Sequence, residues 1–271
     1  MKVTALATTL LLSGALAVTA QTKLIIKGSD TLGAKMVPQL AEAYKAEGNS
    51  ADFEIAAEGS SSAFTALLAG TAEIGMSSRD VKDKEKNEFT AKGEELVEHV
   101  AAFDMISVVV NKKNSVRGLT LEQVEGIFTG DITDWSQVGG AAGPISAYTR
   151  NTSSGTYKSF QQLAMNNRDY SESTQKMAGN QQIVEEVSKN SNGIGYVGLA
   201  YAKAEGLRSI KIEGVAAKPS KVEDYPLARK LYYYTVGEPT GEVKKFIDWA
   251  TTSEKAKEVI TQVKFIPPTG E

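Results

Sequence analysis

The sequence predicts an α/β fold with mostly parallel sheets, and three observations support this prediction. Short β-branched runs alternate with segments whose apolar residues recur at helical spacing, which is typical of strands covered by helices. The chain has 271 residues, enough for one large or two ordinary domains. Hydrophobic residues make up 41% and charged residues 23%, close to the averages for soluble globular domains. These proportions indicate a packed chain rather than a disordered one.

Residues 1–20 have the pattern of a cleaved secretory signal peptide. Lys2 supplies a positive charge, an apolar run extends from Leu6 to Val18, and small residues precede a cleavage site after Ala20. The apolar run is shorter than the roughly 20 residues that a membrane-spanning helix needs. No cysteine follows the run, so a lipid anchor at that position is excluded. We therefore expect the mature chain to be secreted.

The first part of the expected mature chain consists of strands that lead through polar loops into helices. Lys23 to Lys27 is a short apolar run typical of a strand, and a helix with apolar residues at helical spacing is expected from about Gly33 to Glu47. The same pattern then recurs. Its expected elements are a strand near Asp52 to Ala57, a helix through Phe64, Leu67 and Leu68, a strand at Ala72 to Met76, a polar helix at Lys82 to Glu95, and a buried strand at Met105 to Asn111.

The second part of the chain continues this alternation. The expected elements are a helix at Leu121 to Phe128, strands at Ile145 to Thr149 and Ile194 to Gly198, a helical turn at Ala202 to Glu205, a strand at Leu231 to Val236, and helices at about Gly241 to Thr251 and Glu254 to Val263. No low-complexity linker interrupts the chain. Any connection between two lobes is therefore expected to run through strands, best at 101–108 and 225–232.

The composition excludes several kinds of functional site. The chain has no cysteine and a single histidine, His99, which rules out disulfide frameworks, Cys/His zinc sites and cysteine nucleophiles. A Ser/His catalytic pair would have to use His99. The 30 Lys and Arg residues stand against 33 Asp and Glu, a net charge of -3 that offers no basic field for nucleic acid. A bound anion would therefore have to be held by local geometry.

Three loops place Ser, Thr and Gly where an expected strand leads into an expected helix. They are GSDT at 28–31, GSSS at 59–62 and SSGT at 153–156, with Arg150 just before the third. The first backbone N–H groups of a helix have no internal partner and carry the positive end of the helix dipole. Each cluster alone is explained by ordinary helix capping. The three together, with the arginine, indicate a site for an oxyanion at the carboxyl ends of the strands.

Six segments in this order resemble the phosphate-binding periplasmic proteins of ABC transporters, a two-lobed class of solute-binding proteins. The segments are GSDTL (28–32), EGSSSAFTALLAGTAEIGMSSRD (58–80), IFTGDITDW (127–135), RNTSSGTYKSF (150–160), GIGYVGLAYA (193–202) and YPLARKLYYYT (225–235). The resemblance covers residues 23–271 and implies a two-lobed periplasmic-binding-protein fold with mixed, mostly parallel sheets and two strand-like interlobe crossings. It implies one lobe from residues 21–103 and 232–271, and a second lobe from residues 104–231.

The resemblance also implies a set of anion ligands wherever this sequence matches the family's motifs. The implied ligand residues are Thr31, Leu32, Ser60, Ser78, Arg79, Arg150, Ser154, Gly155 and Thr156. The fork of Arg150 suits a tetrahedral oxyanion. Two positions depart from the best-known members, in which aspartates accept the phosphate proton and orient the arginine. Ser78 and Thr152 stand at those two places in this chain.

Nearby residues are candidates to compensate for these departures. Arg79 follows Ser78 and is expected to enter the anion's shell, as a Ser-Arg pair does in shorter family members. The alternative is that Arg79 faces solvent and pairs with Asp80 or Asp83. Asp30, inside the first loop, is a further candidate for the missing acceptor.

The function implied by the resemblance is that of a periplasmic receptor that captures inorganic phosphate between two lobes and presents it to an ABC permease in the inner membrane. Such a receptor breaks no bond, needs no cofactor or metal, binds no nucleic acid, and is expected to be a monomer. Ser78 leaves open another tetrahedral oxyanion, such as sulfate or arsenate, because a hydroxyl can donate to an unprotonated anion. Two other classes also stay open: a secreted serine hydrolase or phosphatase with Ser60 or Ser154 as nucleophile, and an extracellular scaffold.

Overall fold

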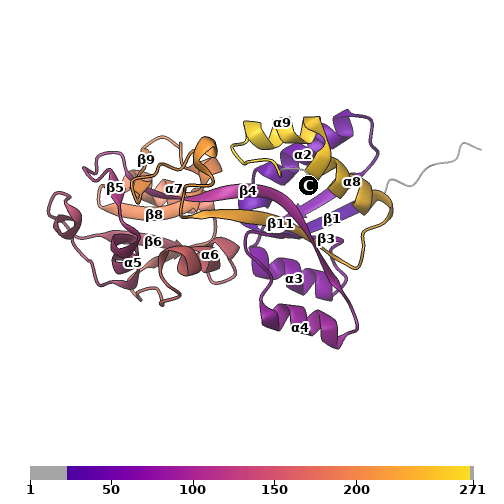
Figure 1. The fold of residues 1–271 in the computed structure, drawn as a ribbon, viewed down its shortest axis with the longest axis horizontal. Coiled ribbons are helices and arrows are strands. Elements are labelled where there is room, and N and C mark those ends of the chain that lie inside the picture. The colour runs from indigo at the N-terminus through magenta and orange to yellow at the C-terminus, as the bar shows by residue number, and fades with distance from the viewer. Residues whose placement is uncertain (1–22, 269–271) are drawn as a thin grey trace, which may run out of the picture.

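The computed structural model describes residues 23–268, so the expected signal peptide lies outside the described residues. Within that range the chain forms a mixed α/β structure with two lobes (Figure 1). We call lobe I the part with β1 to β3, α1 to α4, α8 and α9, and lobe II the part with β5 to β10 and α5 to α7. Strands β4 and β11 run through both lobes.

Lobe I is built on three parallel strands with helices on both faces. Strand β1 (Lys23–Gly28) lies between β2 (Asp52–Ala56) and β3 (Ile74–Ser77). The helices are α1 (Asp30–Gly33), α2 (Met36–Ala46), α3 (Ser60–Leu68), α4 (Asp83–Ala91), α8 (Gly241–Thr252) and α9 (Glu254–Gln262). In Figure 1, α2, α8 and α9 cover one face and α3 and α4 the other. Each face therefore has its own apolar cluster.

Lobe II repeats this arrangement. Strand β6 (Ser146–Arg150) lies parallel between β8 (Gly193–Gly198) and β7 (Gln175–Met177). The remaining strands are β9 (Leu207–Ser209), which pairs with β4, and the parallel pair β5 (Gly118–Leu119) and β10 (Lys211–Ile212). The helices are α5 (Leu121–Thr129), α6 (Gly155–Ala164) and α7 (Asn180–Lys189), and 3-10 turns occur at Trp135–Val138, Leu199–Tyr201 and Pro219–Lys221.

Strands β4 (Leu96–Asn111) and β11 (Ala228–Val236) pair antiparallel and join the two halves of one sheet. The order is β2-β1-β3-β11-β4-β8-β6-β7, so β11 meets lobe I and β4 meets lobe II. Their register shifts between Leu231 and Tyr232. The lobe limits expected at residues 103 and 231 fall inside these two strands and stay predictions.

The structure differs from the sequence-based elements at several places. The helix expected from Gly33 to Glu47 is two helices, because the Ser29 hydroxyl caps a separate short α1, accepting from the amide of Thr31 at 3.2 Å. Strand β4 begins nine residues before Met105, since its first half pairs with β11. The helical turn expected at 202–205 is instead a 3-10 turn at Leu199–Tyr201. Helix α7 was not predicted at all.

Candidate anion-binding site

Three loops that follow parallel strands bring their hydroxyls together between the lobes. The loop after β1 leads into α1, the loop after β2 into α3, and the loop after β6 into α6. Thr31 of lobe I and Thr156 of lobe II meet with their Oγ1 atoms 3.0 Å apart. Ser60 and Ser78 of lobe I have Oγ atoms 3.3 Å apart. The two lobes therefore contact each other at the site.

The hydroxyls are arranged so that several protons stay available to an anion. Ser60 Oγ accepts from the backbone amide of Ser78 at 3.0 Å, and Ser154 Oγ accepts from that of Tyr157 at 3.3 Å. A hydroxyl that accepts such a bond still has its own proton to donate. Thr31, Ser60, Ser78, Ser154 and Thr156 are all buried. The site is thus rich in donors that are shielded from bulk water.

Gly155 permits a very close approach between the lobes. A Cβ atom at this position would lie 2.2 Å from Ser60 Oγ and 2.6 Å from Ser78 Oγ. A side chain there would therefore displace the Ser60 and Ser78 hydroxyls or α6 itself. Leu32 contributes differently, because its side chain belongs to the core of lobe I and only its backbone N–H can face an anion.

Two further hydrogen bonds join the loop after β2 to the loop after β6. The backbone N–H of Ser61 donates to the carbonyl of Ser153 at 3.1 Å, and the Ser153 hydroxyl donates to the carbonyl of Glu58 at 3.2 Å. Gly59 adopts a φ of +121°, and a Cβ there would lie 2.8 Å from the Ser153 carbonyl oxygen. This turn therefore needs glycine on both counts.

Arg150 is the buried cation of the site. It ends β6, is 1% exposed, and donates through Nη2 to the carbonyl of Ala178 at 2.7 Å. Its Nε and Nη1 atoms have no hydrogen-bond partner among residues 23–268. Burial lowers the pKa of the guanidinium from its ordinary value, and the nearby carboxylate of Asp30 opposes this shift. A buried guanidinium with donors left without a hydrogen bond favours binding of an anion.

The carboxylate that pairs with Arg150 belongs to Asp30 of the opposite lobe, with Nη1 and Oδ2 3.3 Å apart. In the family motif an aspartate would stand at Thr152. Asp30 also accepts from the backbone amide and from Nδ2 of Asn180, at 3.0 and 2.7 Å. The structure thus places a carboxylate beside the arginine from the first loop rather than from the third.

Arg79 is the second cation of the predicted set, and both of its terminal nitrogens are bound to a carboxylate. Nη1 and Nη2 donate to the two carboxylate oxygens of Glu85, at 2.8 and 2.6 Å, and Nη2 lies 3.3 Å from Ser61 Oγ. The side chain is buried, and its acidic partner is neither Asp80 nor Asp83. A direct role for Arg79 in anion binding stays a prediction.

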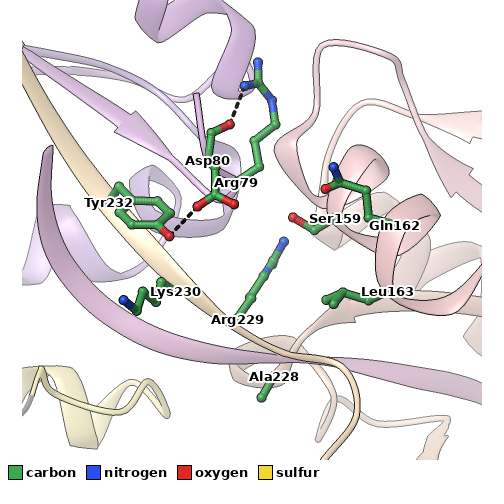
Figure 2. A pocket seen from close by; sticks show the side chains of 9 residues that line it. All are labelled: Arg79, Asp80, Ser159, Gln162, Leu163, Ala228, Arg229, Lys230 and Tyr232. Carbon is green, nitrogen blue, oxygen red and sulfur yellow. Dashed lines mark hydrogen bonds between the residues drawn. The ribbon is translucent and has the colours of Figure 1, made fainter. Parts of the chain in front are cut away.

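A cavity of about 200 Å³ lies beside the site, between α6, β11 and the end of β3 (Figure 2). Figure 2 shows the guanidinium of Arg79 turned away from Arg229 and Ser159. Ser159 Oγ and Arg229 Nη1 both donate to the carbonyl of Ser78, at 2.9 and 3.1 Å. The cavity wall therefore supports the backbone of a predicted ligand residue.

Sequence reasoning missed Asn180, Ser159 and Arg229, which hold the site residues in place. Asn180 begins α7, a helix that could have been found from the spacing of its buried residues Ile183, Val184 and Val187. No sequence signal pairs Arg229 with Ser78, because 151 residues separate them.

The single histidine contacts a residue outside the three loops. His99 lies in β4 with Nε2 3.2 Å from the Oγ1 atom of Thr235. Within residues 23–268, no group of three or more His, Cys, Asp and Glu side chains has the arrangement of a metal site. In the same range no helix combines the length and apolar character of a membrane span.

Comparison with known proteins agrees with this geometry. A family model described as the PBP superfamily domain matches residues 15–254. The chain is also 36% identical over 231 residues to phosphate-binding protein PstS of Pseudomonas aeruginosa PAO1, which covers 76% of this chain and 70% of that protein. The chain belongs to the phosphate-binding protein family of the PBP superfamily. PstS of Bacillus subtilis 168 is 29% identical over 248 residues, 91% of this chain and 81% of that protein.

Solved structures of this family have the same fold. A phosphate ABC transporter substrate-binding protein from Clostridium perfringens, so described and solved with bound phosphate, has a TM-score of 0.84 and 31% identity, covering 92% of this chain and all of that one. An ABC-type phosphate transport receptor from Vibrio cholerae has a TM-score of 0.73 and 28% identity, covering 90% of this chain and all of that one. The two-lobed fold predicted from the sequence is confirmed.

Proposed function

We propose that this protein captures inorganic phosphate between its lobes and delivers it to an ABC permease. The observation that carries the proposal is the buried Arg150, whose Nε has no hydrogen-bond partner among residues 23–268 and whose Nη1 has only the Asp30 carboxylate, 3.3 Å away, as a partner. Family membership supports phosphate as the anion, because the relatives are named phosphate-binding proteins. Capture of this kind needs no chemical step, so we propose a binding protein rather than an enzyme.

The proposed shell has enough donors for tight binding. A micromolar complex needs about 8 kcal/mol, and a hydrogen bond to a charged group contributes about 1.5–3 kcal/mol before the costs of closure are subtracted. Six to eight donors therefore suffice, whereas three do not. We propose that they come from both lobes, so that binding requires closure. The donors are Thr31, Leu32, Ser60, Ser78, Arg150, Ser154, Gly155 and Thr156, with Arg79 as an additional candidate.

The cellular setting follows from the same proposal. We propose that residues 1–20 direct export to the periplasm and are removed there. The mature protein would act as a monomer and dock on a permease in the inner membrane. Family membership supports the transport role, since relatives are described as ABC transporter substrate-binding proteins.

A receptor for another tetrahedral oxyanion is the alternative that the geometry favours most. The Ser78 hydroxyl beside Ser60 can either accept or donate a hydrogen bond. The acceptor that would exclude unprotonated sulfate is therefore not a fixed carboxylate at this position. For a hydrolase, His99 would have to activate Ser60 or Ser154, but its ring nitrogen contacts Thr235 instead.

Calorimetric titration of phosphate-stripped mature protein with phosphate and, separately, with sulfate tests the proposal. We expect micromolar or tighter binding of phosphate and weaker binding of sulfate. Arg150→Ala should weaken phosphate binding by at least about 2 kcal/mol, since it removes a charged partner from a desolvated anion. Arg168→Ala, which removes an exposed arginine paired with Glu125 and Asp131, is the matched control.

Three results would count against this function. Equal binding of phosphate and sulfate would make the protein a general oxyanion receptor, and binding of neither would favour the scaffold. Less than a threefold effect of Arg150→Ala would place the arginine outside the anion's shell.

A further inference from the structure

The carboxylate of Asp30 belongs to lobe I by its backbone but makes its polar contacts with lobe II. Oδ2 accepts from the backbone amide and Nδ2 of Asn180 and lies 3.3 Å from Nη1 of Arg150. Among residues 23–268, no lobe I group hydrogen-bonds this carboxylate. These contacts can therefore exist only when the lobes are closed.

Lobe II holds this carboxylate in a defined position. Asn180 is fully buried, and its Oδ1 accepts from the backbone amide of Gly198 at 3.1 Å, which fixes the orientation of the amide side chain. A Cβ at Gly179 would lie 3.1 Å from Asp30 Oδ1, so glycine leaves room for the carboxylate. Asn180 is also the first residue of the ten-residue α7, whose dipole favours a negative charge at this end.

We propose that Asp30 and Asn180 are positioning residues that couple the orientation of Arg150 to closure of the lobes. This inference rests on the proposed function. Nη2 of Arg150 is held within lobe II by the Ala178 carbonyl, and Asp30 restrains Nη1 from the other side of the interface. When the lobes close on phosphate, the carboxylate orients the fork of the guanidinium and adds lobe-to-lobe bonds. When the lobes open, all these bonds are lost together.

The direction in which Asp30→Ala changes phosphate affinity distinguishes a positioning role from that of a nearby charge. A negative charge next to the anion repels it, so a bystander carboxylate would weaken phosphate binding and its removal would strengthen it. A positioning carboxylate has the opposite effect, because its removal leaves Arg150 unrestrained and the closed state less stable. Asp30→Ala should therefore weaken binding if the proposal is right.

The experiment measures phosphate association and dissociation rates by stopped flow for wild type, Asp30→Ala and Asn180→Leu. Because positioning stabilises the closed complex, we expect dissociation to accelerate about tenfold in both variants, with association changed less than threefold. Gln181→Ala, an exposed neighbour on the same turn of α7, is the control and should leave both rates unchanged. Asp30→Asn keeps the shape of the side chain beside Asn180 but removes the charge that faces Nη1 of Arg150, so dissociation should accelerate in this variant too.

A second readout does not depend on phosphate. The chain has no cysteine, so Glu88→Cys on α4 and Lys189→Cys on α7 allow a fluorescent donor and acceptor to be attached to the two lobes. Without phosphate, Asp30→Ala should shift energy transfer toward the open arrangement relative to wild type. This measurement tests the inference even if the wild-type protein binds no phosphate. Failure to bind phosphate would overturn only the proposed function.

The inference is overturned if Asp30→Ala binds phosphate as tightly as wild type or tighter. It is equally overturned if Asp30→Ala leaves the energy transfer of the phosphate-free protein unchanged. An Asn180→Leu protein that fails to fold would not decide the matter, because Asp30→Ala and Asp30→Asn test the same contact independently.

Discussion

Arg229 and Asp104 face each other on β11 and β4 and form a buried ion pair where these strands pass between the lobes. Nη2 and Nε of Arg229 lie 2.8 and 3.2 Å from Oδ2 of Asp104, and the two side chains are 5% and 0% exposed. Asp104 also accepts from the amide of Leu199 in lobe II, and Arg229 donates to the carbonyl of Ser78 in lobe I. The pair therefore connects the strands to both lobes.

Removal of one member of this pair should be strongly destabilising. Asp104→Ala leaves the Arg229 guanidinium buried without its counter-charge, and such a change typically costs about 3–5 kcal/mol of unfolding free energy. Urea denaturation followed by circular dichroism measures the loss. Arg168→Ala, which breaks an exposed ion pair, should cost less than about 1 kcal/mol. Equal effects of the two substitutions would show that the interlobe pair adds no more stability than a surface one.

Gly155→Ala should impair closure on the anion while leaving each lobe folded. Its Cβ would lie 2.2 Å from Ser60 Oγ, and such overpacking usually costs about 1–3 kcal/mol, so phosphate affinity should fall at least about fivefold. Gly143→Ala is the control, since its Cβ would meet its nearest atom at an ordinary 3.5 Å. Titration calorimetry and thermal denaturation together check the prediction, which an unchanged affinity would contradict.

Arg79→Ala should lower stability more than phosphate affinity. The guanidinium is occupied by Glu85 in a largely buried ion pair, so its removal leaves a carboxylate without its partner. We expect phosphate affinity to change less than about threefold, whereas a larger loss would establish the direct ligand role that the sequence suggests. Glu85→Gln is the companion variant, because it disturbs the same pair without removing the arginine.

His99 should make stability fall as the pH drops below about 6.5. Burial lowers the pKa of its ring from the ordinary value of 6.5, with Glu238 and Asp248 opposing the shift. The unfolded chain therefore binds the proton more readily than the folded one, so the contribution is full above pH 6.5 and is lost toward the folded pKa. Because the chain has one histidine, nuclear magnetic resonance can follow this ring alone. In His99→Gln the stability difference between pH 7 and pH 5 should be smaller than in wild type.

The alternation of strands and helices was readable in the sequence because it depends on local patterning. Most predicted strands, such as that at 194–198, appear within a residue or two of their expected bounds. Errors occurred where distant partners decide the outcome. The start of β4 was not predicted, because its residues 96–100 alternate weakly and become a strand through pairing with β11.

The candidate site likewise has parts that local sequence patterns predict and parts that they do not. The three Ser/Thr/Gly loops and Arg150 were found from sequence, because hydroxyls and glycines at helix starts are local features. Asp30 was a candidate acceptor, but neither its pairing with Arg150 nor the role of Asn180 was predicted. Asp30 meets Arg150 across 120 positions of the chain, and Asn180 lies on a helix that sequence reasoning overlooked.

The sequence by itself determined the fold class, the family and the loops that present donors to an anion. Only the tertiary structure decided which carboxylate faces Arg150, where the guanidinium of Arg79 points, and how closely Gly155 approaches Ser60. The physical reason is the range of the interactions. Capping and hydrophobic periodicity act over a few residues, whereas ion pairs and close backbone contacts between lobes depend on how two separately packed cores are placed against each other.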